Sequence, residues 1–313
     1  MAQHLLADLI RRAGSVVIDG AMSTALEKLG CDLNDKLWSA RVLIEDPAKI
    51  RQVHFDYFEA GANVAITASY QATEAGFRER GIDSKAAYDL IAQSVTLAKE
   101  ARADFLVRHP EKDPKSLLIA GAVGPYGAYL ANGAEYTGDY HLSNDEYRTF
   151  HQLRLKALVD AGADFLGIET QARLDEVKVL LEMLEELDAA AWVTFTLKDS
   201  GHIADGTPIE EAAEACGKHP LVDAIGINCV KREVVAETLQ RISSVTSKPM
   251  IVYPNSGETY DPTTKTWHHP VTGPGWGNFI PKWKSMGAVC LGGCCRTLPS
   301  DIVQIANLMK AAS

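Results

Sequence analysis

The feature that most constrains the fold is an alternation, along the whole chain, of short apolar runs with longer segments of helical pattern. This alternation is typical of βα units, in which helices connect parallel strands. Eight runs have the character of buried strands, and eight strands close a (β/α)8 TIM barrel. The predicted strands are residues 16–19, 64–67, 117–121, 165–169, 191–197, 224–229, 249–253 and 288–291.

The segments between these runs read as helices, each opening with a capping residue or with a proline at the first helical position. They include residues 47–60, 84–107, 144–161, 174–187, 209–216, 233–244 and 299–310. The competing arrangement, a doubly wound sheet, usually carries a glycine fingerprint at the first βα turn. That turn begins at Asp19 and has no G-x-G-x-x-G. The sequence therefore favours a single α/β TIM barrel domain over residues 1–313.

Composition excludes several classes of partner. The 31 lysines and arginines against 41 aspartates and glutamates give a net charge of −10, without the basic cluster of a nucleic-acid-binding protein. The apolar run at residues 5–10 is too short for a signal peptide, and none approaches a membrane span. We therefore expect a cytoplasmic protein with no membrane or nucleic-acid partner. Its six cysteines should be reduced thiols or metal ligands.

Three of the six cysteines stand at strand ends. Cys229 ends the sixth predicted strand, and Cys294 and Cys295 follow Gly292-Gly293 after the eighth. Neighbouring side chains on a strand point to opposite faces, but a turn at the glycines lets both thiols face one point. Three convergent thiolates without a fourth protein ligand describe a catalytic zinc site with an open position. The alternative is that each is a small buried apolar side chain, which is our reading of Cys31, Cys216 and Cys290.

The motifs around these cysteines resemble those of the homocysteine S-methyltransferase family. Cys229 after GIN and the run GGCCRT at 292–297 are similar to the zinc signature of that family. The resemblance extends over nearly the whole chain. It includes DGAMSTALEKLG from Asp19, TASYQAT from Thr67, GPYGAYLANGAEYTGDY from Gly124, GIET from Gly167 and YPNSGETYD from Tyr253.

The resemblance implies methyl transfer to L-homocysteine, giving methionine, with zinc held by Cys229, Cys294 and Cys295. The GPYGAYL and YPNSGE stretches resemble the short members that use S-methylmethionine, and S-adenosylmethionine is the alternative donor because both are sulfoniums. The chain ends eighteen residues after Cys295, without the C-terminal arm of the betaine-using relatives or a cobalamin module. We therefore expect neither of those donors, and we expect a monomer.

The same resemblance implies which residues bind homocysteine. Asp19 and Glu169 end the first and fourth predicted strands, where an unpaired carboxylate is costly, and they match residues that bind the homocysteine ammonium group. Residues 20–23, including Gly20 and Ala21, lead into a helix whose N–H groups suit a carboxylate. Thr67 and Ser69 match positions that close around the amino acid backbone, although their hydroxyls equally suit hydrogen bonds within the barrel rim.

The candidates for contact with the methyl donor are aromatic residues. Trp38 matches a tryptophan that packs against the cationic donor in betaine-using relatives, and a sulfonium is attracted by an aromatic face. Tyr126, Tyr129 and Trp267 are further candidates in two long connections, residues 124–147 and 255–279, with ordinary packing as their alternative role.

Two other functions would use the same cysteines. A zinc hydrolase would bind water at the open position, but hydrolase sites favour histidine and carboxylate ligands. A redox sensor or metal-buffering protein would use the thiols without an organic substrate.

Overall fold

The chain folds as a (β/α)8 TIM barrel, as predicted. The computed structural model describes residues 2–35, 37–257, 259–261, 266–268 and 275–311. The parallel sheet has the strand order β1-β12-β9-β8-β5-β4-β3-β2, and a bridge between Ile18 and Val64 joins its two edges. Its strands are β1 Val16–Val17, β2 Val64–Ile66, β3 Leu118–Val123, β4 Phe165–Gln171, β5 Ala191–Phe195, β8 Val222–Asn228, β9 Met250–Tyr253 and β12 Ala288–Leu291.

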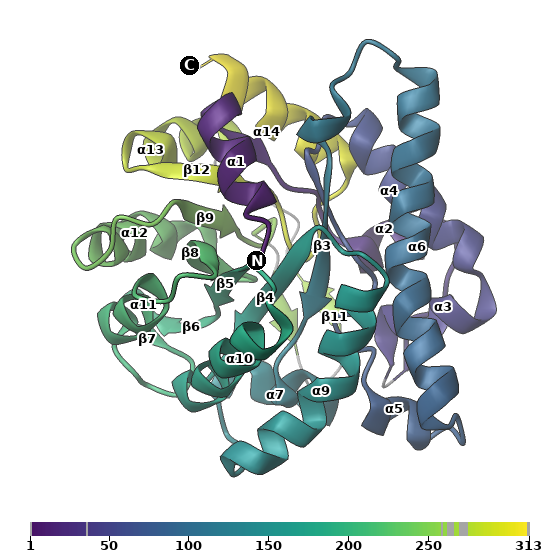
Figure 1. The fold of residues 1–313 in the computed structure, drawn as a ribbon. Helices are drawn as coiled ribbons and strands as arrows, with labels where there is room; N and C mark the ends of the chain where they lie inside the picture. The colour runs from purple at the N-terminus through teal and green to yellow at the C-terminus, as the bar shows by residue number, and fades with distance from the viewer. Residues whose placement is uncertain (1, 36, 258, 262–265, 269–274, 312–313) are drawn as a thin grey trace.

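Helices surround the barrel (Figure 1). All seven helical segments of the sequence analysis are present, α9 with a capping box between Ser143 and Glu146. No helix in the described part of the chain is both long and apolar enough to cross a membrane. The helices are α1 Leu5–Ala13, α2 Met22–Lys28, α3 Val42–Glu45, α4 Pro47–Glu59, α5 Glu74–Arg78, α6 Ser84–Arg108, α7 Tyr126–Leu130, α8 Ala134–Thr137, α9 Asn144–Asp160, α10 Leu174–Leu187, α11 Ile209–Gly217, α12 Val235–Ser243, α13 Ile280–Ser285 and α14 Pro299–Ala311.

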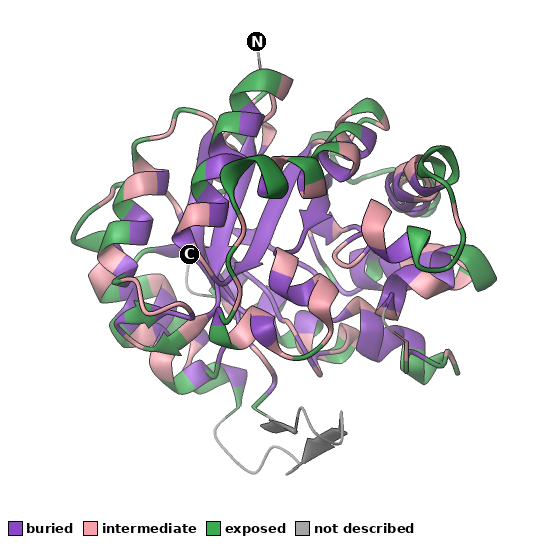
Figure 2. Cartoon of the chain, turned by 90° about the horizontal axis from the view of Figure 1, so that it is seen from below, coloured by how far each residue is buried: buried purple, intermediate pink, exposed green. Residues whose placement is uncertain are grey.

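The core has two layers, one inside the barrel and one between strands and helices. Figure 2 shows the buried strands at the centre and the exposed faces of the helices outside. Helix α1, which the sequence analysis did not predict, places Leu6 and Leu9 in the cluster that fills the barrel, together with Val16 and Trp192. It therefore packs on the amino ends of the strands and leaves their carboxyl ends to the loops.

The connections after the strands carry small elements of their own. The connection at 124–147 contains α7 and α8, and a short 3-10 helix, Trp38–Arg41, lies between β1 and α3. Two antiparallel strand pairs lie outside the barrel sheet. They are β6 Leu197–Asp199 with β7 His202–Ile203, and β10 Thr259–Asp261 with β11 Thr266–His268.

Candidate active site and metal centre

A cavity of about 750 Å³ lies at the carboxyl ends of the strands, where active sites of such barrels are found. Residues at or directly after six different strands line it. They are Gly20 after β1, Ile66 in β2 with Thr67 behind it, Glu169 in β4, Cys229 after β8, Tyr253 in β9, and Cys294 and Cys295 after β12.

Cys229 reaches this cavity through an unusual backbone conformation. It is the first residue after β8 and has a φ of 55°, a left-handed value that non-glycine residues adopt rarely. Its N–H donates to the Tyr253 carbonyl oxygen at 3.1 Å. The side chain of Asn228 accepts a hydrogen bond from the Thr170 N–H at 2.8 Å, which joins the ends of β4 and β8. The turn at Cys229 thus changes the direction of its thiol relative to the regular strand.

The two glycines before Cys294 allow the chain to turn, as predicted. A Cβ at Gly292 would lie 2.7 Å from the Ile18 Cβ, and one at Gly293 would lie 2.5 Å from the Thr297 Oγ1. Neither position therefore accepts a side chain without displacement of its neighbours. The Gly293 N–H donates to the Asp19 carbonyl oxygen at 3.2 Å, and the Cys294 N–H donates to that of Pro254 at 2.8 Å. These bonds fix the loop that carries both thiols.

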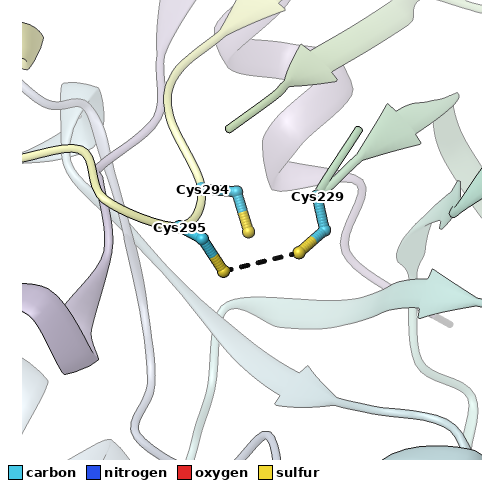
Figure 3. A group of neighbouring side chains, drawn as sticks. All are labelled: Cys229, Cys294 and Cys295. Carbon is cyan, nitrogen blue, oxygen red and sulfur yellow. Dashed lines mark hydrogen bonds between the residues drawn. The ribbon is translucent and has the colours of Figure 1, made fainter. Parts of the chain in front are cut away.

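The three predicted thiols converge (Figure 3). The Sγ atoms of Cys229, Cys294 and Cys295 all lie within 4.8 Å of one another, and those of Cys229 and Cys295 are 3.6 Å apart. They form the one group of at least three such ligands in the part of the chain that the structure describes. The arrangement can hold a metal ion. All six cysteines are free thiols.

The remaining cysteines differ among themselves. Cys216 and Cys290 are fully buried, and burial raises the pKa of each thiol, as expected for apolar packing. Cys31 packs against the core but is only partly buried and also lines the cavity, so the expectation of a buried apolar side chain holds only in part. The cause is its position on the loop after α2, at the mouth of the barrel rather than within it.

Within the cluster, one thiol ionises more readily than the others. Hydrogen bonds from the Cys294 and Cys295 thiols lower the pKa of Cys229 well below its usual value. The pKa values of Cys294 and Cys295 are raised, because each donates to Cys229 and is buried beside it. The Tyr136 hydroxyl lies 3.4 Å from the Cys229 Sγ. Hydrogen bonds from the neighbouring thiols would therefore stabilise an ionised Cys229.

Asp19 is buried at the edge where the barrel closes. Its Oδ2 accepts a hydrogen bond from the Ile66 N–H at 2.8 Å, so the side chain replaces a backbone acceptor between β1 and β2. Its Oδ1 is buried without a partner. Burial raises the pKa of Asp19 well above its usual value, against the effect of the Ile66 hydrogen bond. The free oxygen is a site for a hydrogen-bond donor.

Glu169 has a similar environment. It lines the cavity and is only 6% exposed, and its Oε2 accepts a hydrogen bond from the Tyr253 hydroxyl at 3.1 Å. Burial raises its pKa to about 8, partly opposed by the Tyr253 hydrogen bond. Asp19 and Glu169 interact electrostatically, so the structure brings the two predicted carboxylates to one region.

The other predicted substrate contacts fall into two groups. Gly20, Ala21 and Thr67 line the cavity, whereas Ser69 does not. The Ser69 hydroxyl donates to the Ala122 carbonyl oxygen at 2.8 Å and lies 2.7 Å from the Thr67 Oγ1. The Ala21 N–H donates to the Thr297 Oγ1 at 3.2 Å. Much of the hydrogen-bonding capacity of these residues is therefore used within the barrel rim.

Most of the chain matches one family of known proteins. A family model described as homocysteine S-methyltransferase matches residues 16–309. The chain belongs to the homocysteine S-methyltransferase family. It is 48% identical over 299 residues to the homocysteine S-methyltransferase of Escherichia coli, covering 95% of this chain and 96% of that one. It is also 48% identical over 294 residues to the homocysteine S-methyltransferase YbgG of Bacillus subtilis, covering 93% of each.

A solved structure supports the same conclusion. The crystal structure of the homocysteine methyltransferase MmuM from Escherichia coli, in a metallated form, matches with a TM-score of 0.88 at 45% identity. The match covers 99% of this chain and 100% of that one. Methyl transfer to homocysteine is therefore the activity of this homocysteine S-methyltransferase.

Of the aromatic residues predicted to contact the methyl donor, the structure places some in the cavity and others outside it. Trp38 lines the cavity, with its ring 6.2 Å from that of Tyr70 in an edge-on arrangement. Tyr126 and Tyr129 instead pack on Phe150 and are not among the lining residues, because α7 holds them on its outer side toward α9. The side chain of Trp267 lies outside the described part of the structure.

Several residues of the cavity were not assigned a role by the sequence analysis, among them Tyr70, Glu135 and Tyr136. Tyr70 follows the TAS motif that drew attention to Thr67 and Ser69. Glu135 and Tyr136 lie in the four-residue helix α8, which has no periodicity to read. Their one signal was the long connection that contains them, since long loops in compact domains usually serve function.

Proposed function

We propose that this chain transfers a methyl group from S-methylmethionine, or from S-adenosylmethionine, to L-homocysteine, with a zinc ion held by Cys229, Cys294 and Cys295. The observation that carries the proposal is the convergence of these three thiols within 4.8 Å at the mouth of the barrel. A cavity of about 750 Å³ next to them leaves room for an acceptor and a donor together.

The thiols fit zinc in number, chemistry and spacing. Zinc–sulfur bonds of about 2.3 Å in tetrahedral geometry separate two ligand sulfurs by roughly 3.8 Å. The Cys229 and Cys295 Sγ atoms are 3.6 Å apart, and the Cys294 Sγ lies within 4.8 Å of both. Three protein ligands leave one position for the sulfur of the substrate. When bound, the metal would supply deprotonation of the homocysteine thiol, which is mostly protonated in neutral water.

We assign the amino acid end of homocysteine to the first and fourth strands. An ammonium group would satisfy the unpartnered Oδ1 of Asp19 and would neutralise the buried Glu169 carboxylate. The Gly20, Ala21 and Thr67 segments would close around the backbone of the substrate. Ser69 acts behind them, because its hydroxyl holds the Thr67 side chain. Zinc at one end and two carboxylates at the other fix the orientation of the acceptor.

Donor binding is assigned to the aromatic side of the cavity. Trp38 lies there with Tyr70, and a sulfonium is attracted by the negative face of an aromatic ring. The methyl carbon then passes directly from the donor sulfur to the thiolate, since no enzyme nucleophile is required. Proximity and orientation supply much of the rate of such a two-substrate step.

The test compares matched serine variants. Cys229→Ser, Cys294→Ser and Cys295→Ser are each expected to lose zinc and methionine formation, whereas Cys216→Ser, far from the cavity, is expected to retain both. Methionine formation is assayed with S-methylmethionine and S-adenosylmethionine separately, and zinc is measured by atomic emission. Full activity of a metal-free variant would contradict the zinc assignment. A metal-loaded wild type inactive with both sulfoniums would contradict the donor assignment.

We further propose that the protein works as a cytoplasmic monomer. Every residue assigned to the site comes from one barrel, and a reducing compartment keeps the three thiols available for metal. Sedimentation velocity is expected to give the mass of one chain, and a stable dimer would contradict this proposal.

A further inference from the structure

Glu135 is a carboxylate of the cavity that the assignments above leave without a role. It is the second residue of α8 and lines the cavity with Trp38, Tyr70 and the metal-ligating thiols. Its Oε2 is buried and has no hydrogen-bond partner. No basic residue pairs with it in the described part of the chain.

Among the residues that the structure describes, none places a compensating positive charge against Glu135. The groups with which it interacts electrostatically are Cys229, Cys295, Tyr70 and Tyr136, all of them neutral or negative. A buried carboxylate without a cation is costly and persists where a ligand completes it. A positively charged ligand that enters the cavity would supply the partner that Glu135 lacks among the described residues.

The positions of the three carboxylates distinguish the binding sites of the two substrates. Asp19 lies in the barrel rim, where it interacts electrostatically with Glu169, and both are assigned to the ammonium group of homocysteine. Glu135 lies instead among the groups that surround the thiols and the aromatic pair of Trp38 and Tyr70. The methyl donor must place its sulfonium between the thiols and this aromatic pair, because the methyl group has to face the metal-bound sulfur.

We propose that Glu135 recognises the positive charge of the donor sulfonium and so selects cationic methyl donors. The proposal rests on the proposed function, since it assigns one residue to the donor of that reaction. An aromatic face and a carboxylate together bind a sulfonium by its charge without requiring a hydrogen bond, which a sulfonium cannot donate.

The charge on the donor exists only before transfer. The bond between the methyl carbon and the donor sulfur breaks with its electron pair on the donor, while a lone pair of the homocysteine thiolate forms the new bond. A sulfonium and a thiolate thus become two neutral thioethers. Glu135 therefore stabilises the bound donor more than the transition state, and its attraction disappears when the product forms. Its removal should raise the donor KM without lowering kcat.

The test is Glu135→Gln, which keeps size and removes charge. The donor KM is expected to rise at least tenfold for S-methylmethionine, with kcat and the homocysteine KM within about twofold of wild type. Methionine, which has the same amino acid end but no sulfonium, reports the other part of the site. Its inhibition constant against S-methylmethionine should change less than about threefold. Asp139→Asn, an exposed residue of the same connection, is the matched control and should leave all four constants unchanged.

Several outcomes would overturn the inference. An unchanged donor KM in Glu135→Gln would show that the carboxylate does not contact the donor. Equal losses for S-methylmethionine and methionine would place it on the amino group instead. A fall in zinc content or melting temperature would assign it to the structure of the site. Wild-type enzyme inactive with both S-methylmethionine and S-adenosylmethionine would instead contradict the proposed function, so the two failures are distinguishable.

Discussion

At the scale of single residues, Tyr253 has one hydroxyl proton and two acceptors for it. Its oxygen lies 3.1 Å from the Glu169 Oε2 and 2.8 Å from the Thr194 Oγ1. Thr194 donates its own proton to the Asn228 Oδ1 at 2.8 Å, so it cannot also donate to Tyr253. An ionised Glu169 thus receives at most one contested hydrogen bond from Tyr253. Burial raises the pKa of Glu169 to about 8, and the hydrogen bond from Tyr253 opposes this rise only in part.

The state of Glu169 predicts how homocysteine binding depends on pH. Because the pKa is raised to about 8, the carboxyl is neutral below that pH and becomes a partner for an ammonium group as pH rises. The KM for homocysteine is expected to fall between pH 6.5 and 8, by up to about tenfold per unit. Steady-state kinetics across this range measures it.

The control for this prediction is a thiol without the amino group, 4-mercaptobutyrate. It shares the thiol ionisation of homocysteine but makes no contact with Glu169, so its KM should lack the additional pH dependence. Glu169→Gln should make the two pH profiles parallel. Profiles that are already parallel in the wild type would show that Glu169 does not bind the ammonium group.

At the scale of elements, a buried network anchors the connection that carries Glu135. The Glu176 carboxylate in α10 accepts from the Tyr126 N–H at 2.7 Å and from the Tyr140 hydroxyl at 2.6 Å. It also lies 2.8 Å from the His151 Nε2. Arg154 lies 2.9 Å from the His151 Nδ1 and donates to the Gly124 carbonyl oxygen at 2.6 Å. A neutral His151 can therefore bridge the buried charges of Glu176 and Arg154 and so tie α7 to α9 and α10.

Removing the negative charge of this network should destabilise the protein. Glu176→Gln leaves Arg154 buried without compensation, which typically costs about 3–5 kcal/mol, and loosens the connection on which Glu135 depends. We expect a lower melting temperature and a higher donor KM, measured by calorimetry and kinetics. Glu182→Gln, on the same helix but exposed and paired with Arg148 at the surface, should cost less than about 1 kcal/mol. Equal effects of the two variants would contradict this role.

The elements also show which parts of the molecule can be predicted from sequence. The eight strands were predictable because parallel strands buried on both faces read as continuous apolar runs. Cys294 and Cys295 were predictable because the cause of their turn, two glycines, is adjacent to them. Glu135 was not, because α8 has four residues and its connection is held by Glu176, distant in sequence. Helix α1 was missed because its two buried leucines gain meaning only against the end of a closed barrel.

At the scale of the whole molecule, the thiol cluster joins separate parts of the sheet. Cys229 follows β8 and the other two thiols follow β12, with β9 between these strands. A metal bound here connects segments 66 residues apart in sequence, as between Cys229 and Cys295. Because the unfolded chain lacks this site, metal binding stabilises the fold by mass action, by about 2.7 kcal/mol at one hundred times the Kd. We therefore expect a metal bound at the cluster to serve both the proposed catalysis and the stability of the fold.

Loss of the metal should allow two of the three thiols to form a disulfide. Cys229 and Cys295 have their Sγ atoms 3.6 Å apart, whereas a disulfide between the adjacent Cys294 and Cys295 would strain the backbone. Treatment with a chelator and then oxidised glutathione is expected to oxidise Cys229 and Cys295 to one disulfide, with two molecules of reduced glutathione formed. The product should be inactive and should recover with reductant and zinc. Peptide mapping identifies the link, Cys216→Ser should behave as wild type, and Cys229→Ser should not form it. Only free thiols at these positions after oxidation would show that the three side chains do not converge in solution.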